Sequence, residues 1–301
     1  MVKLRSTKIS EPISDKIFGA ACVCISTIFV LMVLYPLIYI VSASVSDPHL
    51  VNSGAVWLWP RGLNIDGYLR IFQTRNLMIG YANTIFYTVF GTLINLILTL
   101  PCAYAISKKS LPGRVYIMIF LMIPMYFSGG LIPTYLWIIR GLNLGDTRIL
   151  LLIIGAVSIF NLMIARSFFL GFPSDLEEAG IIDGCSTTRM FVIIVLPLSK
   201  ALISVLMLYY AVGHWNSWFA AMIYLNDESK MPLQLFLRRI LINNEMIGVE
   251  IDDPERLQRA AELATLLRFS VIIVSSLPVL ILYPFIQKYF DKGVMLGSLK
   301  G

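Results

Sequence analysis

The chain has 301 residues, of which 57% are hydrophobic and only 14% are charged, and its formal net charge is +6. A soluble domain of ordinary composition carries about 25% charged residues, so a typical soluble globular protein is excluded. Long charge-free stretches account for the difference. Because only helices and closed barrels satisfy their backbone groups in lipid, and these stretches have helical length, we predict an all-α polytopic membrane protein.

Six stretches contain no Lys, Arg, Asp or Glu, and each is close to or above the roughly 17–25 residues that a helix needs to cross the hydrocarbon core. They are residues 17–46, 81–106, 115–139, 149–165, 201–226 and 269–287. We therefore predict six transmembrane helices. The first stretch is about twice as long as the apolar region of a secretory signal, so we interpret it as an uncleaved span.

This pattern divides the chain into segments. We predict an N-terminal tail (1–16), a first transmembrane helix (17–46), an outer loop (47–80), a core with five transmembrane helices (81–290) that contains an inner loop (171–198), and a C-terminal tail (291–301). The short loop "SKKSLPGR" at 107–114 is strongly basic. By the positive-inside rule this loop and both termini are cytoplasmic. The net positive charge is therefore explained by topology, and we expect no nucleic-acid partner.

Two outer segments, 64–76 and 252–270, show helical patterns. In 64–76, Ile65, Tyr68, Leu69 and Phe72 have the spacing of a short helix lying on the membrane surface.

In 252–270, Asp253 is a candidate N-cap and Pro254 a candidate first helical residue. The acidic residues Asp252, Asp253 and Glu255 there allow a divalent ion, but a solvated helix N-terminus explains them better. His49 and His214 are the chain's two histidines and lie in separate regions. We expect neither a metal site nor a cofactor.

The inner loop 171–198 contains five charged residues and is too polar to cross a membrane. Ser174 with Glu177 predicts a capping box that starts a helix at Asp175, and Gly184 suits the C-terminal cap. The result is a helix of about ten residues, roughly 15 Å long. A second helix start is predicted at Ser186, and Pro197 should end or kink that segment.

The short helix presents Leu176, Ala179, Gly180 and Asp183 at three- and four-residue spacing, which gives it a small-residue face. Two interpretations remain open from the residues alone. The helix lies on the lipid headgroups, or it docks to a soluble partner.

The stretch "EEAGIIDGCSTTRMFVIIVLPLSK" resembles the EAA loop of binding-protein-dependent ABC importer permeases, whose pattern runs E-A-A, two residues, D-G, and then a run ending in I-x-L-P. Glu178, Ala179, Asp183, Gly184, Ile194, Leu196 and Pro197 match the pattern, and Gly180 replaces the usual second Ala. Segments 209–241 and 292–301 are similar to the carbohydrate branch of this family (MalG/LplC-like). The resemblance covers most of the chain from about residue 70.

The resemblance implies a MetI/MalG-like permease fold with six transmembrane helices in a bacterial cytoplasmic (inner) membrane. It implies that 174–185 is a coupling helix that inserts into a cytoplasmic ATPase dimer through Leu176, Glu178, Ala179, Gly180, Asp183 and Gly184, with Glu178 the first choice for a polar contact. It also implies a second homologous permease, an extracytoplasmic sugar-binding protein, and import of a carbohydrate, expected to be an oligosaccharide. The chain has no G-x-x-x-x-G-K-[ST] motif, so ATP hydrolysis belongs to a partner subunit and the chain is not an enzyme.

The segment 212–219 places His214, Trp215, Asn216, Ser217 and Trp218 inside the fifth predicted span. Polar groups at membrane depth usually face the bundle interior or a water-filled cavity, and a sugar path needs hydrogen-bonding groups and aromatic faces. These residues are therefore candidates for the substrate pathway. The alternative is interhelical hydrogen bonding and aromatic packing.

Other polar or irregular positions are weaker candidates. We favour packing over substrate contact for Asn83, Thr84, Asn95 and Asn161. A further set, Pro124, Gly129, Gly130 and Pro133, interrupts the third span and allows either a hinge or a kink.

Two other functions compete with an importer permease. A self-powered secondary transporter or channel for a small polar solute needs ionisable residues within spans or inverted repeats, and the charge-free spans argue against it. A membrane-embedded enzyme needs a cluster of carboxylate, His or Cys side chains at one depth, and the sequence shows none.

Overall fold

The structure is a computed structural model that describes residues 12–243, 262, 264–281 and 283–284. All regular elements in these residues are helical, which confirms the predicted all-α fold. Three of the described helices are long and apolar enough to cross a membrane, or up to five if each of two bent pairs counts as one crossing. Six crossings therefore remain a prediction.

The described residues fall into two units, one within Met1–Leu69 and Gly248–Ile273, the other within Arg70–Ile247 and Val274–Gly301. The first unit contains α1 (Ile13–Ser44), α2 (Pro48–Asn52) and the start of α3 (Asp66–Gln73). Its small core is formed by Ala43, Val51 and Val56. The first predicted span is therefore confirmed as one continuous helix, α1, whose apolar side chains are largely exposed.

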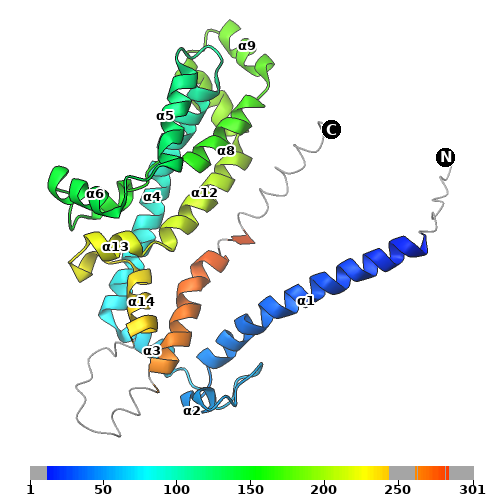
Figure 1. Cartoon of the computed structure of the whole chain (residues 1–301), viewed down its shortest axis with the longest axis vertical. Coiled ribbons are helices and arrows are strands. Elements are labelled where there is room, and N and C mark those ends of the chain that lie inside the picture. Colours follow the sequence, from blue (N-terminus) through cyan, green and yellow to red (C-terminus); the bar gives the residue numbers. More distant parts are fainter. Residues whose placement is uncertain (1–11, 244–261, 263, 282, 285–301) are drawn as a thin grey trace. The chain divides into compact units, whose positions relative to one another are not determined.

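The larger unit is a helix bundle (Figure 1). Its elements are α4 (Arg75–Ser107), α5 (Arg114–Tyr126), α6 (Leu131–Leu136), the π-helix η1 (Trp137–Gly141), α7 (Arg148–Ile153), α8 (Ile159–Leu170), α9 (Ser174–Ile182), α10 (Thr187–Met190), the π-helix η2 (Phe191–Val195), α11 (Leu196–Leu198), α12 (Lys200–Trp215), α13 (Phe219–Tyr224), the 3₁₀ helix η3 (Glu228–Lys230) and α14 (Leu233–Asn243). A further helix, Ala264–Ile281, spans the boundary between the two units.

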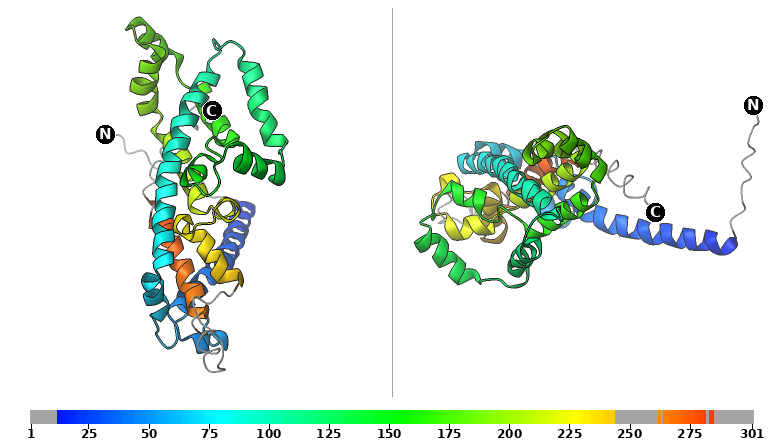
Figure 2. Two further views of the ribbon diagram at one scale, coloured as in Figure 1. Left: turned by 90° about the vertical axis from the view of Figure 1, so that its left-hand side faces the viewer. Right: turned by 90° about the horizontal axis from the view of Figure 1, so that it is seen from above.

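The long helix α4 runs through the larger unit and packs against α8, α12 and α14 (Figure 2). Its length of 33 residues corresponds to about 50 Å at 1.5 Å per residue. One end of α4 meets α14 and η3, and the other end lies near α9. A single helix therefore connects the two ends of this unit.

The third predicted span is broken. Its residues form α5 followed by α6 and η1, with a bend of 110° between the two parts. Gly130, at the break, has a φ of +82°, a left-handed conformation that glycine adopts without strain. The irregularity expected from the Gly and Pro residues is thus a sharp bend.

The fourth and fifth spans also differ from the predicted single helices. Residues of the fourth form α7 and α8, separated at Gly155, whose φ is +70°. In the fifth, α12 ends at Trp215, and α13 begins at Phe219. Both predicted runs are continuous in hydropathy, and hydropathy does not report backbone breaks of this kind.

The amphipathic pattern in 64–76 correctly predicts a helix, α3. Ile65, Leu69 and Phe72 are exposed, as a helix lying on a membrane surface requires. The helix start predicted at Asp253 and Pro254, the acidic group with Asp252 and Glu255, and the tail 291–301 lie outside the described residues.

Candidate functional site

The predicted coupling helix is present as α9, a nine-residue helix at one end of the larger unit (Figure 1). Its C-terminus closes in a Schellman motif: the Cys185 N–H donates to the Gly180 carbonyl at 2.9 Å, and the Gly184 N–H donates to the Ile181 carbonyl at 3.0 Å. Gly184 has a φ of +73°, as this motif requires. The role of Gly184 as a cap is confirmed.

The predicted capping box at the N-terminus of α9 is wrong. The helix begins at Ser174 after Pro173, and no side chain caps it. The Ser174 hydroxyl contacts the Asp175 carboxylate at 3.4 Å instead. Pro173 holds the N-cap position, and the Glu177 carboxylate contacts the C-terminal end of α4.

Glu177 joins α9 to the C-terminal end of α4. Its Oε1 atom forms an ion pair with Lys108 Nζ and accepts a hydrogen bond from the Tyr104 hydroxyl at 3.3 Å. The Lys108 ammonium also lies 4.3 Å from the centroid of the Tyr104 ring, a cation–π contact. Lys108 is 69 residues away in the chain, so no local signal in the sequence links it to Glu177.

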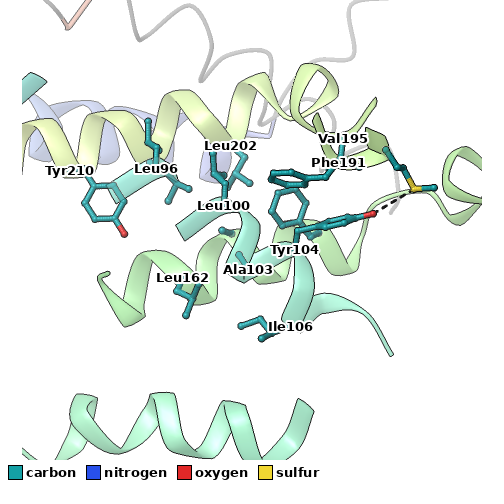
Figure 3. Packing of buried hydrophobic residues seen from close by; sticks show 14 residues of the cluster. Leu96, Leu100, Ala103, Tyr104, Ile106, Leu162, Phe191, Val195, Leu202 and Tyr210 are labelled. Carbon is teal, nitrogen blue, oxygen red and sulfur yellow. Dashed lines mark hydrogen bonds between the residues drawn. The ribbon is translucent and has the colours of Figure 1, made fainter. Parts of the chain in front are cut away.

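Tyr104 belongs to the main apolar core of the unit (Figure 3). Its ring contacts Phe169 and Phe191 at centroid distances of 5.6 and 5.1 Å, and its hydroxyl also lies 3.7 Å from the Met190 sulfur. The Tyr104 side chain, which contacts both Lys108 and Glu177, is thus packed against α8, α10 and η2.

The predicted coupling residues of α9 point to two sides. Leu176, Glu178 and Ala179 are exposed, as are Asp183 and Gly184. Gly180 is the buried residue of α9, and a Cβ there would lie 3.2 Å from Met190 and Ile194. Gly180 thus permits close packing within this chain, while the other five are open to a partner.

Two residues of the exposed surface were missed by the sequence analysis. Ile181 and Ile182 are 66% and 85% exposed. Two adjacent isoleucines within the mostly polar stretch 174–189 were the available signal. Leu176 is a third exposed apolar side chain of α9, and Ile182 lies one helical turn after the exposed Glu178.

The segment after α9 starts at Ser186, as predicted, and the Ser186 hydroxyl accepts from the Arg189 N–H. It continues through α10, η2 and α11 and then bends by 82° into α12 at Ser199. Pro197 removes one backbone N–H and displaces the preceding turn, and the π-helix η2 ends two residues before it. The kink predicted from Pro197 is confirmed.

His214 lies between α12 and α4. Its Nε2 atom is 2.7 Å from the Asn95 Oδ1 atom, and Asn95 Nδ2 donates to the Ala156 carbonyl at 2.7 Å. A Cβ on Gly91 would lie 2.5 Å from the His214 ring, so the ring fills the space that this glycine leaves. These contacts favour interhelical hydrogen bonding for His214.

The remaining candidates of the 212–219 segment do not lie on one helical face, because α12 ends at Trp215. Trp215 is buried, and its Nε1 donates to the Ser275 carbonyl at 2.9 Å. Asn216 is exposed, Ser217 is half-buried, and Trp218 stacks beneath the Arg238 guanidinium at 4.1 Å. The fifth predicted span is therefore broken after Trp215, and the contact of these residues with substrate stays a prediction.

The polar residues of α4 are used in packing, as we favoured. Asn83 donates to the carbonyls of Ser229 and Met231 at 2.8 and 3.0 Å, and Thr84 accepts from the Leu233 N–H at 2.8 Å. These bonds fix η3 and α14 to the N-terminal half of α4. In α8, Asn161 is buried.

A small cavity lies between α13 and α14. It has a volume of about 230 Å³ and is lined by Met222, Leu225, Met231, Leu235, Arg238 and Arg239. Arg239 forms an ion pair with Glu228 at 2.8 Å. Arg238 stacks on Trp218 and has no carboxylate partner among the described residues. Stacking fixes the plane of the Arg238 guanidinium, and one of its edge donors, Nη1, contacts the Met222 sulfur.

A charged cluster ties the loop before α7 to the loop before α14. Lys230 Nζ lies 3.0 Å from Asp146 Oδ2 and 3.2 Å from Asp227 Oδ2. The backbone N–H of Asp227, the Lys230 ammonium and the backbone N–H of Asn226 together hold the pKa of the Asp146 carboxyl below its ordinary value. The Asp146 carboxylate in turn raises the pKa of Lys230.

Comparison with protein families finds one match over most of the chain. Residues 76–296 match the family described as "Binding-protein-dependent transport system inner membrane component".

Relatives and solved structures agree with this match. The chain is 37% identical to Protein LplC of Bacillus subtilis over 89% of this chain and 90% of that protein. It is 39% identical to the polygalacturonan/rhamnogalacturonan transport system permease protein YtcP of the same organism, over 91% and 94% of the two chains. A chain in the crystal structure of a bacterial ABC transporter involved in the import of the acidic polysaccharide alginate superposes with a TM-score of 0.85 at 34% identity, covering 94% of this chain and all of that one.

Proposed function

The chain belongs to the binding-protein-dependent transport system inner membrane components, and from this premise we propose that it is a permease subunit that imports an oligosaccharide. The chain is a transport permease, and ATP hydrolysis in such importers belongs to a separate subunit. Family membership decides against the self-powered transporter and the membrane-embedded enzyme. The observation that carries the proposal is α9, a capped helix with an uncovered surface at one end of the bundle.

The proposed partners follow from the family. A second permease completes the pathway, an extracytoplasmic binding protein delivers the sugar, and an ATPase dimer docks on α9 from the cytoplasm. Exposed Leu176, Glu178 and Ala179 are the proposed contact residues, and exposed Ile182 extends their surface. We further propose that both termini are cytoplasmic, as the positive-inside rule predicts, and that the loop 140–147 and α14 are on the outer side.

The proposed substrate is an acidic oligosaccharide. The names of two similar proteins state acidic polysaccharides as substrates: one is a polygalacturonan/rhamnogalacturonan permease, and the other belongs to an importer of alginate. Within this chain, the stacked Arg238 lines a cavity together with Arg239 and four apolar side chains. A guanidinium edge binds a carboxylate with two parallel hydrogen bonds, and the apolar walls suit the apolar face of a sugar ring.

Binding to the purified permease–ATPase complex, without the binding protein, tests this substrate class. Trigalacturonate is compared with its methyl ester, which has the same ring skeleton and no charge. Arg238→Met should weaken binding of trigalacturonate by about tenfold, the order expected for one charge-assisted contact, and should leave ester binding unchanged. Arg239→Met is the matched control, because Arg239 is already paired with Glu228.

Two results would count against an acidic substrate. Equal affinity of the wild-type complex for trigalacturonate and its methyl ester would show that the site has no preference for a carboxylate. An Arg238→Met variant that loses acid and ester binding alike would make Arg238 a structural residue.

A further inference from the structure

The helix α9 is held to the bundle by few contacts of its own. Gly180 is its buried residue, and its exposed positions include Leu176, Ile181 and Ile182. Apolar burial therefore contributes little to the orientation of α9. Among the described residues, Glu177 with Lys108 is the one ion pair that joins α9 to another part of the bundle.

This ion pair is partly shielded from solvent. The side chains of Lys108 and Glu177 are 25% and 20% exposed, so it is less screened than a fully exposed pair. Its charges also suit the two helix ends that meet here. Lys108 caps the C-terminal end of α4, and Glu177 lies in the first turn of α9, where helix dipoles favour a cation and an anion respectively.

The chain itself offers a weaker connection from α9 to the bundle. From α9 onward, the chain passes through Gly184, the π-helix η2 and the 82° bend at Ser199 before it reaches α12. Each of these features is a point at which a displacement can be absorbed. The Glu177 contact bypasses them and reaches α4 directly.

We propose that Glu177 and Lys108 are positioning residues that fix α9 on the end of α4, with Tyr104 as their base, so that movement of the docked ATPase is passed to α4 as well as to α12. The proposal rests on the proposed function, since it assumes that α9 is the docking helix. Because the other end of α4 holds η3 and α14 through Asn83 and Thr84, this contact links the ATPase side to the region of the Arg238 cavity.

The test uses the full transporter in proteoliposomes, with the binding protein and trigalacturonate outside. The measured quantity is the ratio of stimulated to unstimulated ATP hydrolysis. Glu177→Gln and Lys108→Met should each lower this ratio by about three- to tenfold, the range expected for a coupled pair, and Lys108→Arg should retain most of it. The double variant should be no worse than the poorer single variant, because both changes break one contact.

Two matched controls separate this contact from general effects of charge. Lys109→Met removes the neighbouring, exposed lysine, and Asp175→Asn removes the other first-turn carboxylate of α9. Both should keep the wild-type ratio. Hydrogen exchange of the amides in 178–182 should be faster in the Glu177 and Lys108 variants than in these controls, which reports the orientation of α9 without reference to transport.

The outcomes distinguish this inference from the proposed function. Wild-type complex without any stimulation by sugar and binding protein would overturn the proposed function, while the exchange measurement would still report on the contact. Single-variant losses that multiply in the double variant, with exchange of α9 unchanged, would overturn the positioning role.

Discussion

The Nε2 atom of His214, on α12, lies 2.7 Å from the Oδ1 atom of Asn95, on α4. The amide of Asn95 also binds the Ala156 carbonyl, so one buried side chain ties α4 to α12 and to the segment between α7 and α8. A histidine in an apolar segment suggests a pathway when it is read from sequence. Its partner indicates that its first role is to hold the bundle together.

Replacing Asn95 tests this role. Asn95→Ala leaves the His214 ring and the Ala156 carbonyl without their partner, and an unsatisfied buried polar group costs about 1–3 kcal/mol. The melting temperature of the detergent-purified protein should fall. Asn216→Ala, at an exposed position, should leave it near the wild-type value. An unchanged melting temperature for Asn95→Ala, with an altered sugar preference, would favour the pathway interpretation instead.

Gly184 is the second test position. A Cβ there meets no atom within 4 Å, so a substitution acts through the backbone alone. Gly184→Val places a branched residue at a φ of +73° and should cost roughly 1–2 kcal/mol, which misplaces the turn after α9. Less ATPase subunit should stay on washed membranes. Gly184→Asn is the control, since Asn tolerates this conformation better, and equal retention in both variants would contradict the account.

Local signals predicted α1, α4 and the turn at Gly184. An uninterrupted run of apolar residues is sufficient to predict each of the two helices, and a single glycine is sufficient to predict the turn. They did not predict the breaks at Gly155 and after Trp215, where the run of apolar residues continues across a change of direction. The predicted capping box is wrong because Ser174 is already the first helical residue and Pro173 holds the N-cap position. The contact of Glu177 with Lys108 joins residues 69 positions apart, so local spacing does not reveal it.

The Asp146 carboxyl gives a pH-dependent prediction. Its pKa is lowered from the ordinary 3.8, so its contribution to stability is complete above the ordinary pKa and is lost as the pH falls through the lowered value. The melting-temperature difference between wild-type protein and Asp146→Asn should be constant from about pH 5 to 7 and should shrink below pH 4. A difference that grows on acidification would contradict the ion cluster with Lys230.

Glu178 is exposed on α9, one helical turn before the exposed Ile182. In the proposed docking, its carboxylate faces an Arg or Lys of the ATPase. Glu178→Gln keeps the size and removes the charge, and it should reduce uptake in a way that a compensating change in the ATPase cleft restores. Dipole stabilisation alone is worth roughly 0.3–1 kcal/mol and predicts nearly normal uptake, which would remove Glu178 from the docking surface.

The central claim is that this chain imports a carbohydrate with energy from ATP hydrolysed by a partner. The most direct measurement is uptake of radiolabelled trigalacturonate into proteoliposomes that contain the full transporter, with the binding protein outside and nucleotide inside. We predict accumulation with ATP, and none with a non-hydrolysable analogue. Accumulation driven by a proton or sodium gradient in the absence of ATP would contradict the account.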